Sequence, residues 1–269
     1  MKKFAILAVA AALLIAAVGG KFRQMADEFR NSIPEVEQAG KDVMWVPTPQ
    51  LLIDTMLDMA QVTAADYVID LGSGDGRIVI SAAKRGAMAL GIEYEQRLVE
   101  LARRAAIEER VSARATFEKA DIYEYDFSKA SVLTLFLLPD INLNLRPTIL
   151  DMKPGTRIVS NTFGMGGWEP DQTIRLAEHS LDSTTAHLWI VPPKVHGTWK
   201  CDDGHISLTQ KFQKIAGTLT IKGQEMELSG KLEGDKITFT AGGTVYVGTV
   251  SGDTISGAHS GAGSWKATR

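Results

Sequence analysis

The sequence has almost no cysteine, since Cys201 is the only one among its 269 residues. An intrachain disulfide is therefore excluded, although a single cysteine leaves the redox compartment open. Histidine is also scarce, and His196, Cys201 and His205 form the one grouping with ligand-like spacing. This grouping lacks the paired spacing of a zinc finger, so we expect no metal.

The sequence also has no large excess of charge of either sign. The formal net charge is −3, the charges are spread along the chain, and no basic stripe alternates with aromatic residues. Such a stripe is the usual footprint of nucleic-acid binding, so we expect no nucleic-acid partner. A content of 45% hydrophobic and 23% charged residues is typical of a globular chain with one or two domains.

A long uncharged apolar run stands at the N-terminus, from Phe4 to Gly20, after Lys2 and Lys3. Its length is the lower limit for crossing a hydrocarbon core of about 30 Å, and small residues near its end suit a signal peptidase. Residues 1–20 are therefore expected to be a signal peptide or a membrane anchor, followed by a polar linker over 21–45. The protein is then membrane-associated or exported to the periplasm, with its orientation open because both flanks are basic.

Between residues 46 and 193, short apolar runs alternate with segments of helical period. This alternation indicates an α/β domain with a parallel sheet and helices on both faces. Two alternating runs at its end, residues 173–182 and 185–192, predict an antiparallel hairpin that closes the sheet. The expected strands lie near 67–71, 88–93, 114–118, 131–137 and 156–161, and the expected helices near 76–85, 95–108 and 141–151.

Residues 196–269 lose the helical period, and Gly, Thr and Ser alternate with hydrophobic residues. This pattern predicts a small, separate all-β domain. A weak repeat, GKLEGDKITF from Gly230 and GTVSGDTISG from Gly248, indicates two β-hairpins. The sequences GTWK and GSWK bracket the domain, so we expect its first and last strands to close a barrel or sandwich around Trp199 and Trp265.

Three glycines at alternate positions, Gly72, Gly74 and Gly76, follow the strand expected at 67–71. A turn without side chains lets a ligand lie against the backbone N–H groups and the N-terminus of the next helix. The spacing differs from the G-x-G-x-x-G of dinucleotide folds, and the Gly-Lys-Ser/Thr of a P-loop is missing. Asp70 would repel a pyrophosphate but would pair with an amino group, so we expect a nucleotide-like ligand with a cation there.

Two further acidic residues follow in the next strands. Glu93 ends the second strand, where its carboxylate could accept both hydroxyls of a ribose. In KADIYEYDF, Asp121 could reach an adenine amino group while Ile122 packs on the ring. An amino group, a ribose and an adenine in this order describe S-adenosylmethionine (SAM). The alternatives are a plain tight turn with surface acids, and a NAD-dependent dehydrogenase.

The motifs DLGSGDGR, GIE and KADI resemble the first three nucleoside-contacting motifs of class I SAM-dependent methyltransferases. The resemblance spans Val46 to Pro192. It implies a Rossmann-like, seven-stranded sheet with helices on both faces, and SAM as the cofactor. The cofactor-binding residues that it implies are Asp70, Gly72, Ser73, Gly74, Gly76, Glu93, Asp121 and Ile122.

A narrower resemblance is carried by VPTPQLLIDTMLDMA, LFLLPDINLNLRPTIL and KPGTRIVSNTFGMGGWEPD. These segments resemble the lysine methyltransferase group related to the enzyme that modifies the ATP synthase c-subunit. Many amino-methylating enzymes carry Asn/Asp-Pro-Pro-Tyr after the fourth strand, but this chain has LLPD, so those contacts do not carry over. Asp140 and Asn142, with Asn144 nearby, could orient the acceptor ammonium or pass its proton to water. A helix N-cap is the alternative role for Asp140, and Thr48 lies either in a cover over the cofactor or in an ordinary turn.

Three functions fit these features: a methyltransferase acting on a protein lysine, one acting on a small-molecule or lipid-associated acceptor, and a non-catalytic binding module. Export conflicts with the need for SAM, because SAM is a charged cytoplasmic metabolite that does not cross a bilayer unaided. An enzyme tethered to the membrane and facing inward would keep its donor. The expected partners are therefore a protein or small-molecule acceptor and, through the N-terminal segment, a membrane.

Overall fold

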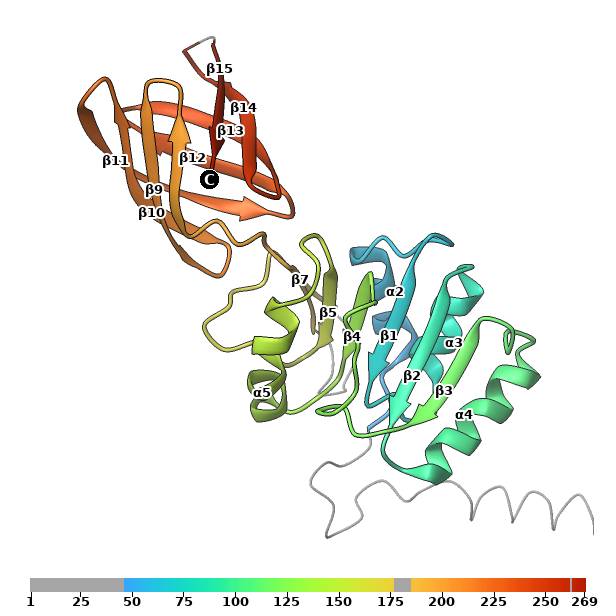
Figure 1. The fold of residues 1–269 in the computed structure, drawn as a ribbon. Coiled ribbons are helices and arrows are strands. Elements are labelled where there is room, and N and C mark those ends of the chain that lie inside the picture. The colour runs from blue at the N-terminus through green and yellow to red at the C-terminus, as the bar shows by residue number, and fades with distance from the viewer. Residues whose placement is uncertain (1–45, 177–184, 262) are drawn as a thin grey trace, which may run out of the picture.

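The computed structural model describes residues 46–176, 185–261 and 263–269, which form an α/β sheet domain followed by a β-barrel (Figure 1). The expected signal peptide or anchor, the linker and the turn of the expected hairpin lie outside these residues. Within the described part of the chain, no helix is long and apolar enough to span a membrane.

Seven strands form the sheet, in the order β3-β2-β1-β4-β5-β7-β6. The first five are parallel, and β7 pairs antiparallel with both β5 and β6, as expected for the closing hairpin. The Rossmann-like sheet is therefore confirmed. The strands are β1 (Tyr67–Leu71), β2 (Met88–Glu93), β3 (Ala115–Lys119), β4 (Val132–Leu135), β5 (Arg157–Asn161), β6 (Gln172–Arg175) and β7 (Thr185–Ile190).

Helices cover both faces of the sheet. Three of them, α2 (Gln50–Met59), α3 (Arg77–Lys84) and α4 (Gln96–Glu108), share one hydrophobic core with one face. The fourth, α5 (Pro139–Leu150), packs on the opposite face (Figure 1). Helix α5 begins two residues earlier than expected, because Pro139 occupies the first helical position, where a missing N–H costs nothing.

The strand order places a topological switch point between β1 and β4. The chain runs outward from β1 to β3 and then returns to β4 on the other side of β1. Connections therefore leave these two strands in opposite directions, an arrangement that in open α/β sheets leaves a crevice at the carboxyl ends. Ligands of open α/β sheets bind in this crevice. The expected glycine turn follows β1, so the fold places it at this point.

The C-terminal domain is a closed eight-stranded barrel. The last strand pairs with the first, with Ala267 opposite Cys201, which closes the sheet on itself. Trp199 is fully buried in the barrel core, and Trp265 packs edge-on against Phe239 at 5.5 Å. The expected closure is confirmed. The strands are β8 (Gly197–Cys201), β9 (Gly204–Lys211), β10 (Lys214–Ile221), β11 (Gln224–Glu233), β12 (Lys236–Ala241), β13 (Thr244–Ser251), β14 (Thr254–His259) and β15 (Gly263–Thr268).

Candidate functional site

The glycine turn has a backbone that other residues would strain. Gly72, Gly74 and Gly76 all have positive φ, at 76°, 54° and 82°. A Cβ at Gly76 would lie 2.6 Å from the Phe117 ring, and one at Gly72 would lie 3.0 Å from Leu137. Glycine is therefore required at both positions, because of conformation and space together.

Asp70 lies at the end of β1 with only 2% of its surface exposed. The Thr134 hydroxyl donates a hydrogen bond of 2.6 Å to its carboxylate. Burial raises the pKa of Asp70 from 3.8 to about 7, the bond from Thr134 opposes the rise, and the carboxylates of Glu93 and Asp75 add to it. Among the described residues, no cation contributes to this shift, so a positively charged ligand group would stabilise the ionised form of Asp70.

Glu93 joins the glycine turn to the end of β2. One carboxylate oxygen accepts the Gly74 N–H at 2.9 Å, and the other accepts the Glu95 N–H at 2.9 Å. A carboxylate oxygen has two lone pairs, so each oxygen keeps one for a further donor. Two hydroxyls of a ribose match this requirement. Glu93 is therefore both oriented by the fold and suited to the predicted contact.

The remaining predicted cofactor residues lie along the same edge. The Ala120 N–H bonds to the Glu93 carbonyl at 3.2 Å, so Asp121 follows directly beside Glu93. One Asp121 oxygen accepts the Tyr123 N–H at 2.8 Å, and Ile122 packs against the core on the α5 face. Ser73 Oγ is buried without a hydrogen-bond partner among the described residues. The structure thus brings all eight predicted residues to one edge of the sheet.

The segment before α2 is tied across this edge by Thr48, which is 3% exposed. Arg77 donates to the Thr48 carbonyl at 3.1 Å and to both Asp75 oxygens at 2.9 and 3.0 Å. Asn161, at the end of β5, donates to the Thr48 hydroxyl at 3.2 Å. Sequence reasoning did not find Arg77 or Asn161. The available signal was their position, directly after the third glycine and at the end of a strand.

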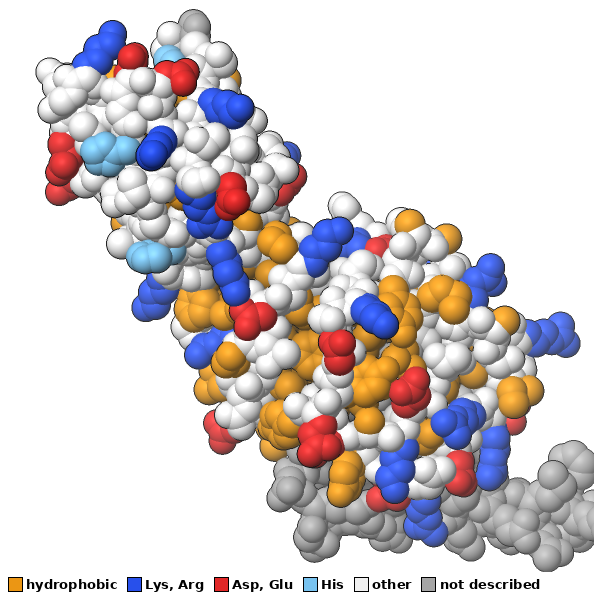
Figure 2. All heavy atoms as spheres, viewed as in Figure 1, with side chains coloured by type: hydrophobic (Ala, Val, Ile, Leu, Met, Phe, Trp, Pro, Cys, Tyr) orange, Lys and Arg blue, Asp and Glu red, His pale blue; other side chains and the backbone are white. Residues whose placement is uncertain are grey.

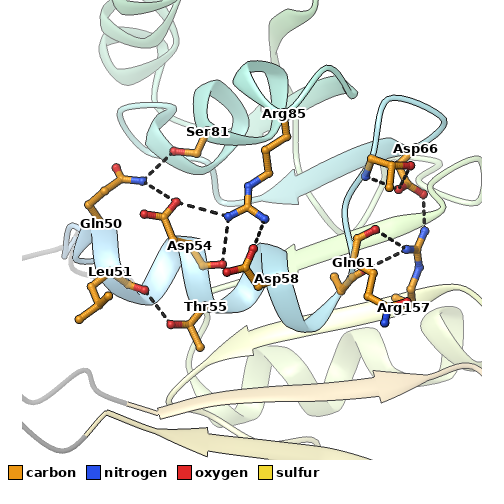
Figure 3. Close-up of polar contacts among 12 residues, drawn as sticks. Gln50, Leu51, Asp54, Thr55, Asp58, Gln61, Asp66, Ser81, Arg85 and Arg157 are labelled. Carbon is orange, nitrogen blue, oxygen red and sulfur yellow. Dashed lines mark hydrogen bonds and ion pairs between the residues drawn. The ribbon is translucent and has the colours of Figure 1, made fainter.

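Polar contacts anchor helix α2 at both ends (Figure 3), and Thr48 lies two residues before this helix. At the first turn of α2, Gln50 donates to the Ser81 hydroxyl of α3 at 3.2 Å. After its last turn, Arg157 of β5 donates to the Ala60 carbonyl at 2.5 Å and pairs with Asp66. The anchoring of α2 therefore holds the segment that contains Thr48 close to Arg77 and Asn161.

The two candidate catalytic residues differ in their surroundings. Asp140 is exposed in the first turn of α5, whose N-cap is Leu138 without a side-chain bond, so the N-cap alternative for Asp140 is wrong. Asn142 is fully buried, and its Nδ2 lies 3.5 and 3.4 Å from the carbonyls of Phe163 and Gly164. Its Oδ1 has no partner within the described residues. Asn142 therefore offers an unused acceptor.

Two aromatic rings flank this region. Phe136 follows β4 and Phe163 follows β5, and their rings stack with centroids 6.1 Å apart and planes at 20°. Leu137, next to Phe136, is the residue that approaches Gly72. The segments after β4 and β5 therefore meet beside the glycine turn, and we call them the acceptor side: residues 136–142 and 160–164.

No group of three or more His, Cys, Asp or Glu residues that could hold a metal occurs in the described ranges. The groups that the site presents are carboxylates, amides, hydroxyls and aromatic rings. Together with a seven-stranded sheet and a glycine turn between two oriented acids, these groups define a class I SAM-dependent methyltransferase.

Comparison with known proteins places the chain within this class. A family model described as the ANTKMT methyltransferase domain matches residues 70–172. A protein-lysine N-methyltransferase of Saccharolobus islandicus is 38% identical over 152 residues, which cover 55% of this chain and 94% of that protein. The chain therefore belongs to the same methyltransferase family as the Saccharolobus enzyme.

Two more relatives extend the comparison. The ATP synthase c-subunit lysine N-methyltransferase of Homo sapiens is 34% identical over 47% of this chain and 54% of its own length. A solved structure described as an RNA methyltransferase from Salinibacter ruber, in complex with S-adenosyl-L-homocysteine, is 43% identical. It covers 56% of this chain and 96% of its own, with a TM-score of 0.53. The chain is thus a SAM-dependent methyltransferase.

Proposed function

We propose that SAM lies along the edge formed by the eight predicted cofactor residues. Asp70 pairs with its amino group, Glu93 accepts its ribose hydroxyls, and Asp121 and Ile122 contact its adenine. The support is the burial of Asp70, which a ligand cation would offset, and the two remaining lone pairs of Glu93.

We further propose that the acceptor is the ε-amino group of a protein lysine. The observation that carries this proposal is Asn142, which is fully buried and whose Oδ1, on the acceptor side, has no partner among the described residues. Buried carbonyl oxygens normally have a hydrogen-bond donor, so this atom is suited to an N–H group of the substrate. The similarity to relatives named as lysine methyltransferases supports the same choice.

The reaction is an in-line displacement, so the protein mainly positions and desolvates its substrates. A lysine enters as an ammonium and must lose one proton before its lone pair can attack. The lone pair then forms a bond to the methyl carbon while the carbon–sulfur bond breaks, which leaves S-adenosylhomocysteine. Asn142 Oδ1 would hold a remaining N–H and so aim the lone pair. The exposed carboxylate of Asp140 would pass the released proton to water.

The aromatic pair suits such a substrate. A lysine has an apolar stem and a cationic head, and aromatic faces favour both through packing and cation–π attraction. Phe136 and Phe163 present their rings beside the segment that contacts the glycine turn. We infer that they line the path by which the lysine reaches the donor methyl.

The N-terminal apolar run favours an acceptor at the membrane. We propose an inward-facing enzyme tethered by residues 1–20, because SAM is available only on the cytoplasmic side. The alternatives are a small-molecule or lipid-associated acceptor and a non-catalytic module. The test below also covers an RNA acceptor, because the Salinibacter relative is described as an RNA methyltransferase.

The test is transfer of labelled methyl from SAM into separated fractions: membrane proteins, soluble proteins, lipids with small molecules, and RNA. Label on a lysine of a membrane protein is the expected result. Asn142→Ala and Asp140→Ala should each lower turnover about tenfold or more, while SAM affinity changes little, as for interactions felt mainly in the transition state.

The exposed Thr148 lies on the same helix and has no assigned role, so Thr148→Ala is the matched control and should behave like the unaltered protein. Thermal unfolding of each variant separates a folding defect from a catalytic one. Label found only in RNA, or only in lipids and small molecules, would overturn the lysine proposal. SAM binding without label in any fraction would favour the non-catalytic module.

A further inference from the structure

One aromatic residue of the barrel belongs to the core of the other domain. Phe212 lies in the turn between β9 and β10 and packs against the core on the α5 face of the sheet domain. Its ring stacks on Trp168, with centroids 6.0 Å apart and planes at 15°. The Arg146 guanidinium of α5 lies 5.3 Å from the same ring. The barrel therefore docks through a stacked aromatic side chain.

The backbone at Phe212 has a left-handed conformation. Its φ of 57° is in the left-handed region, which non-glycine residues rarely adopt. Lys222, in the turn at the other end of β10, has a similar φ of 50°, because two-residue hairpin turns favour positive φ. The conformation therefore belongs to the hairpin turn, which carries the Phe212 ring that stacks on Trp168.

The next two residues of the barrel make polar contacts with Glu169 of the sheet domain. Gln213 is 8% exposed and donates to the Glu169 carbonyl at 2.7 Å. Lys214 pairs with the Glu169 carboxylate at 2.7 Å, although both groups are largely exposed, so this ion pair contributes little. The buried amide of Gln213 and the ring of Phe212 therefore dominate the contact.

The contact between the two domains leaves a largely apolar cleft of about 260 Å³ beside Phe212. The cleft is lined by Leu150, Pro192, Lys194, His196 and Gln210. The space beside this ring is therefore not filled by side chains. Figure 2 shows the hydrophobic side chains of this view gathered on the sheet domain, whereas the barrel presents mostly polar surface. The turn of residues 212–214 supplies the contacts to Trp168 and Glu169, and Gln210 adds bonds to the Val195 N–H and the Pro193 carbonyl.

The barrel docks on a loop that also reaches the acceptor side. This loop, residues 163–169, begins with Phe163 and ends with Glu169. From the α5 side, Arg146 donates to the Met165 carbonyl at 2.7 Å, and Asn142 approaches the first two carbonyls of the loop. A Cβ at Gly166 would lie 2.7 Å from Leu143, so the loop lies tightly on α5. The barrel turn contacts the same loop at Trp168 and Glu169.

We propose that Phe212 is a positioning residue for methyl transfer: the barrel holds the 163–169 loop, and the loop holds Phe163 and Asn142. This inference rests on the proposed function, because it assumes that these two residues meet the acceptor. The barrel then acts on the acceptor side of the reaction. None of the predicted SAM-binding residues contacts the turn through a described bond, so the cofactor side is independent of it.

The test compares Phe212→Ala with Phe212→Tyr, which keeps the ring, and with Lys222→Ala in the full chain. Lys222 is the matched control, since it also has a positive φ, of 50°, but lies in the turn at the opposite end of β10. Two quantities are measured: hydrogen exchange of the Trp168 amide, with strand β1 as reference, and steady-state kinetics with separate SAM titration.

Phe212→Ala should speed exchange at Trp168 about tenfold or more while β1 is unchanged, because Trp168 loses the ring that stacks on it. Its kcat should fall about tenfold, as small displacements of substrate-positioning groups are costly, with the SAM Kd within about twofold. Phe212→Tyr should restore both quantities, and Lys222→Ala should match the unaltered protein.

Unchanged exchange at Trp168 would overturn the proposal, and so would a loosened loop with normal kcat. A parallel loss of SAM affinity would also overturn it, because the barrel would then act on the cofactor side. Failure of the proposed lysine acceptor gives a different result, because the unaltered protein would then place no methyl label on lysine. The exchange comparison needs no acceptor, and kcat is then measured on whichever acceptor takes the label.

Discussion

Asp70 is the residue whose ionisation the fold changes most clearly. Its pKa of about 7, against 3.8 ordinarily, means that the folded protein without ligand keeps a proton that the unfolded chain releases. The free energy of unfolding should therefore fall as the pH rises from about 4 to about 7. Asp70→Asn removes this cost and should stabilise the ligand-free protein at pH 8 by up to about 4 kcal/mol, measured by denaturant unfolding.

The affinity for SAM should rise with pH, whereas the free energy of unfolding of the ligand-free protein should fall. In the proposed complex the amino group of SAM pairs with ionised Asp70, so affinity should rise as the pH increases through about 7. Thr134→Val removes the hydrogen bond that favours the ionised form and should move this midpoint to higher pH. Calorimetry across pH 5 to 8 checks both. If Asp70→Asn binds SAM as well as the unaltered protein at every pH, Asp70 does not contact the amino group.

At the scale of elements, the anchoring of α2 decides the position of Thr48. Burial disfavours ionisation of Asp66, but the Thr63 N–H, the Ser131 hydroxyl and the Arg157 guanidinium outweigh it and lower its pKa. Arg157→Ala would leave an 8% exposed carboxylate without its cation. We expect a loss of about 2 kcal/mol in the free energy of unfolding at pH 7.

The loss in the free energy of unfolding caused by Arg157→Ala should be smaller at acidic pH. The pKa of Asp66 is lowered by folding, so its stabilising effect is present above about pH 4 and disappears as the pH falls through the lowered value. Arg85→Ala is the control: its bond to Asp58 lies at the exposed surface, so its loss should cost about 1 kcal/mol or less. Equal losses for the two variants would contradict the assigned role of Arg157.

Local patterns in the sequence predicted the elements of the sheet well. The strands at 67–71 and 88–93 have the predicted bounds, because apolar runs and turn residues are local signals. The glycine turn and Glu93 could be predicted for the same reason. Arg157 bonding to Ala60, 97 residues away, could not be predicted, since a side-chain contact over that distance leaves no local pattern. The docking of Phe212 on Trp168 escaped prediction likewise.

At the scale of the whole molecule, the barrel should affect turnover and leave the cofactor side intact. Deleting residues 196–269 should leave SAM affinity within about threefold, because none of the predicted cofactor residues lies there. The same deletion exposes Trp168, which is fully buried in the intact chain, so the sheet domain should unfold more easily. A SAM titration and a thermal unfolding curve of the truncated chain test these expectations. A large loss of SAM affinity in a folded fragment would show that the barrel completes the cofactor site.

The central claim is that the glycine turn and the acids beside it bind SAM. Calorimetric titration of SAM into the chain without residues 1–20 tests it most directly. Glu93→Ala should weaken binding by about 1.5–3 kcal/mol through loss of charged hydrogen bonds to the ribose, whereas Glu100→Ala, which removes an exposed carboxylate on α4, should not. Heat with SAM that Glu93→Ala reduces and Glu100→Ala does not is the predicted result, and heat with NAD but none with SAM would contradict the claim.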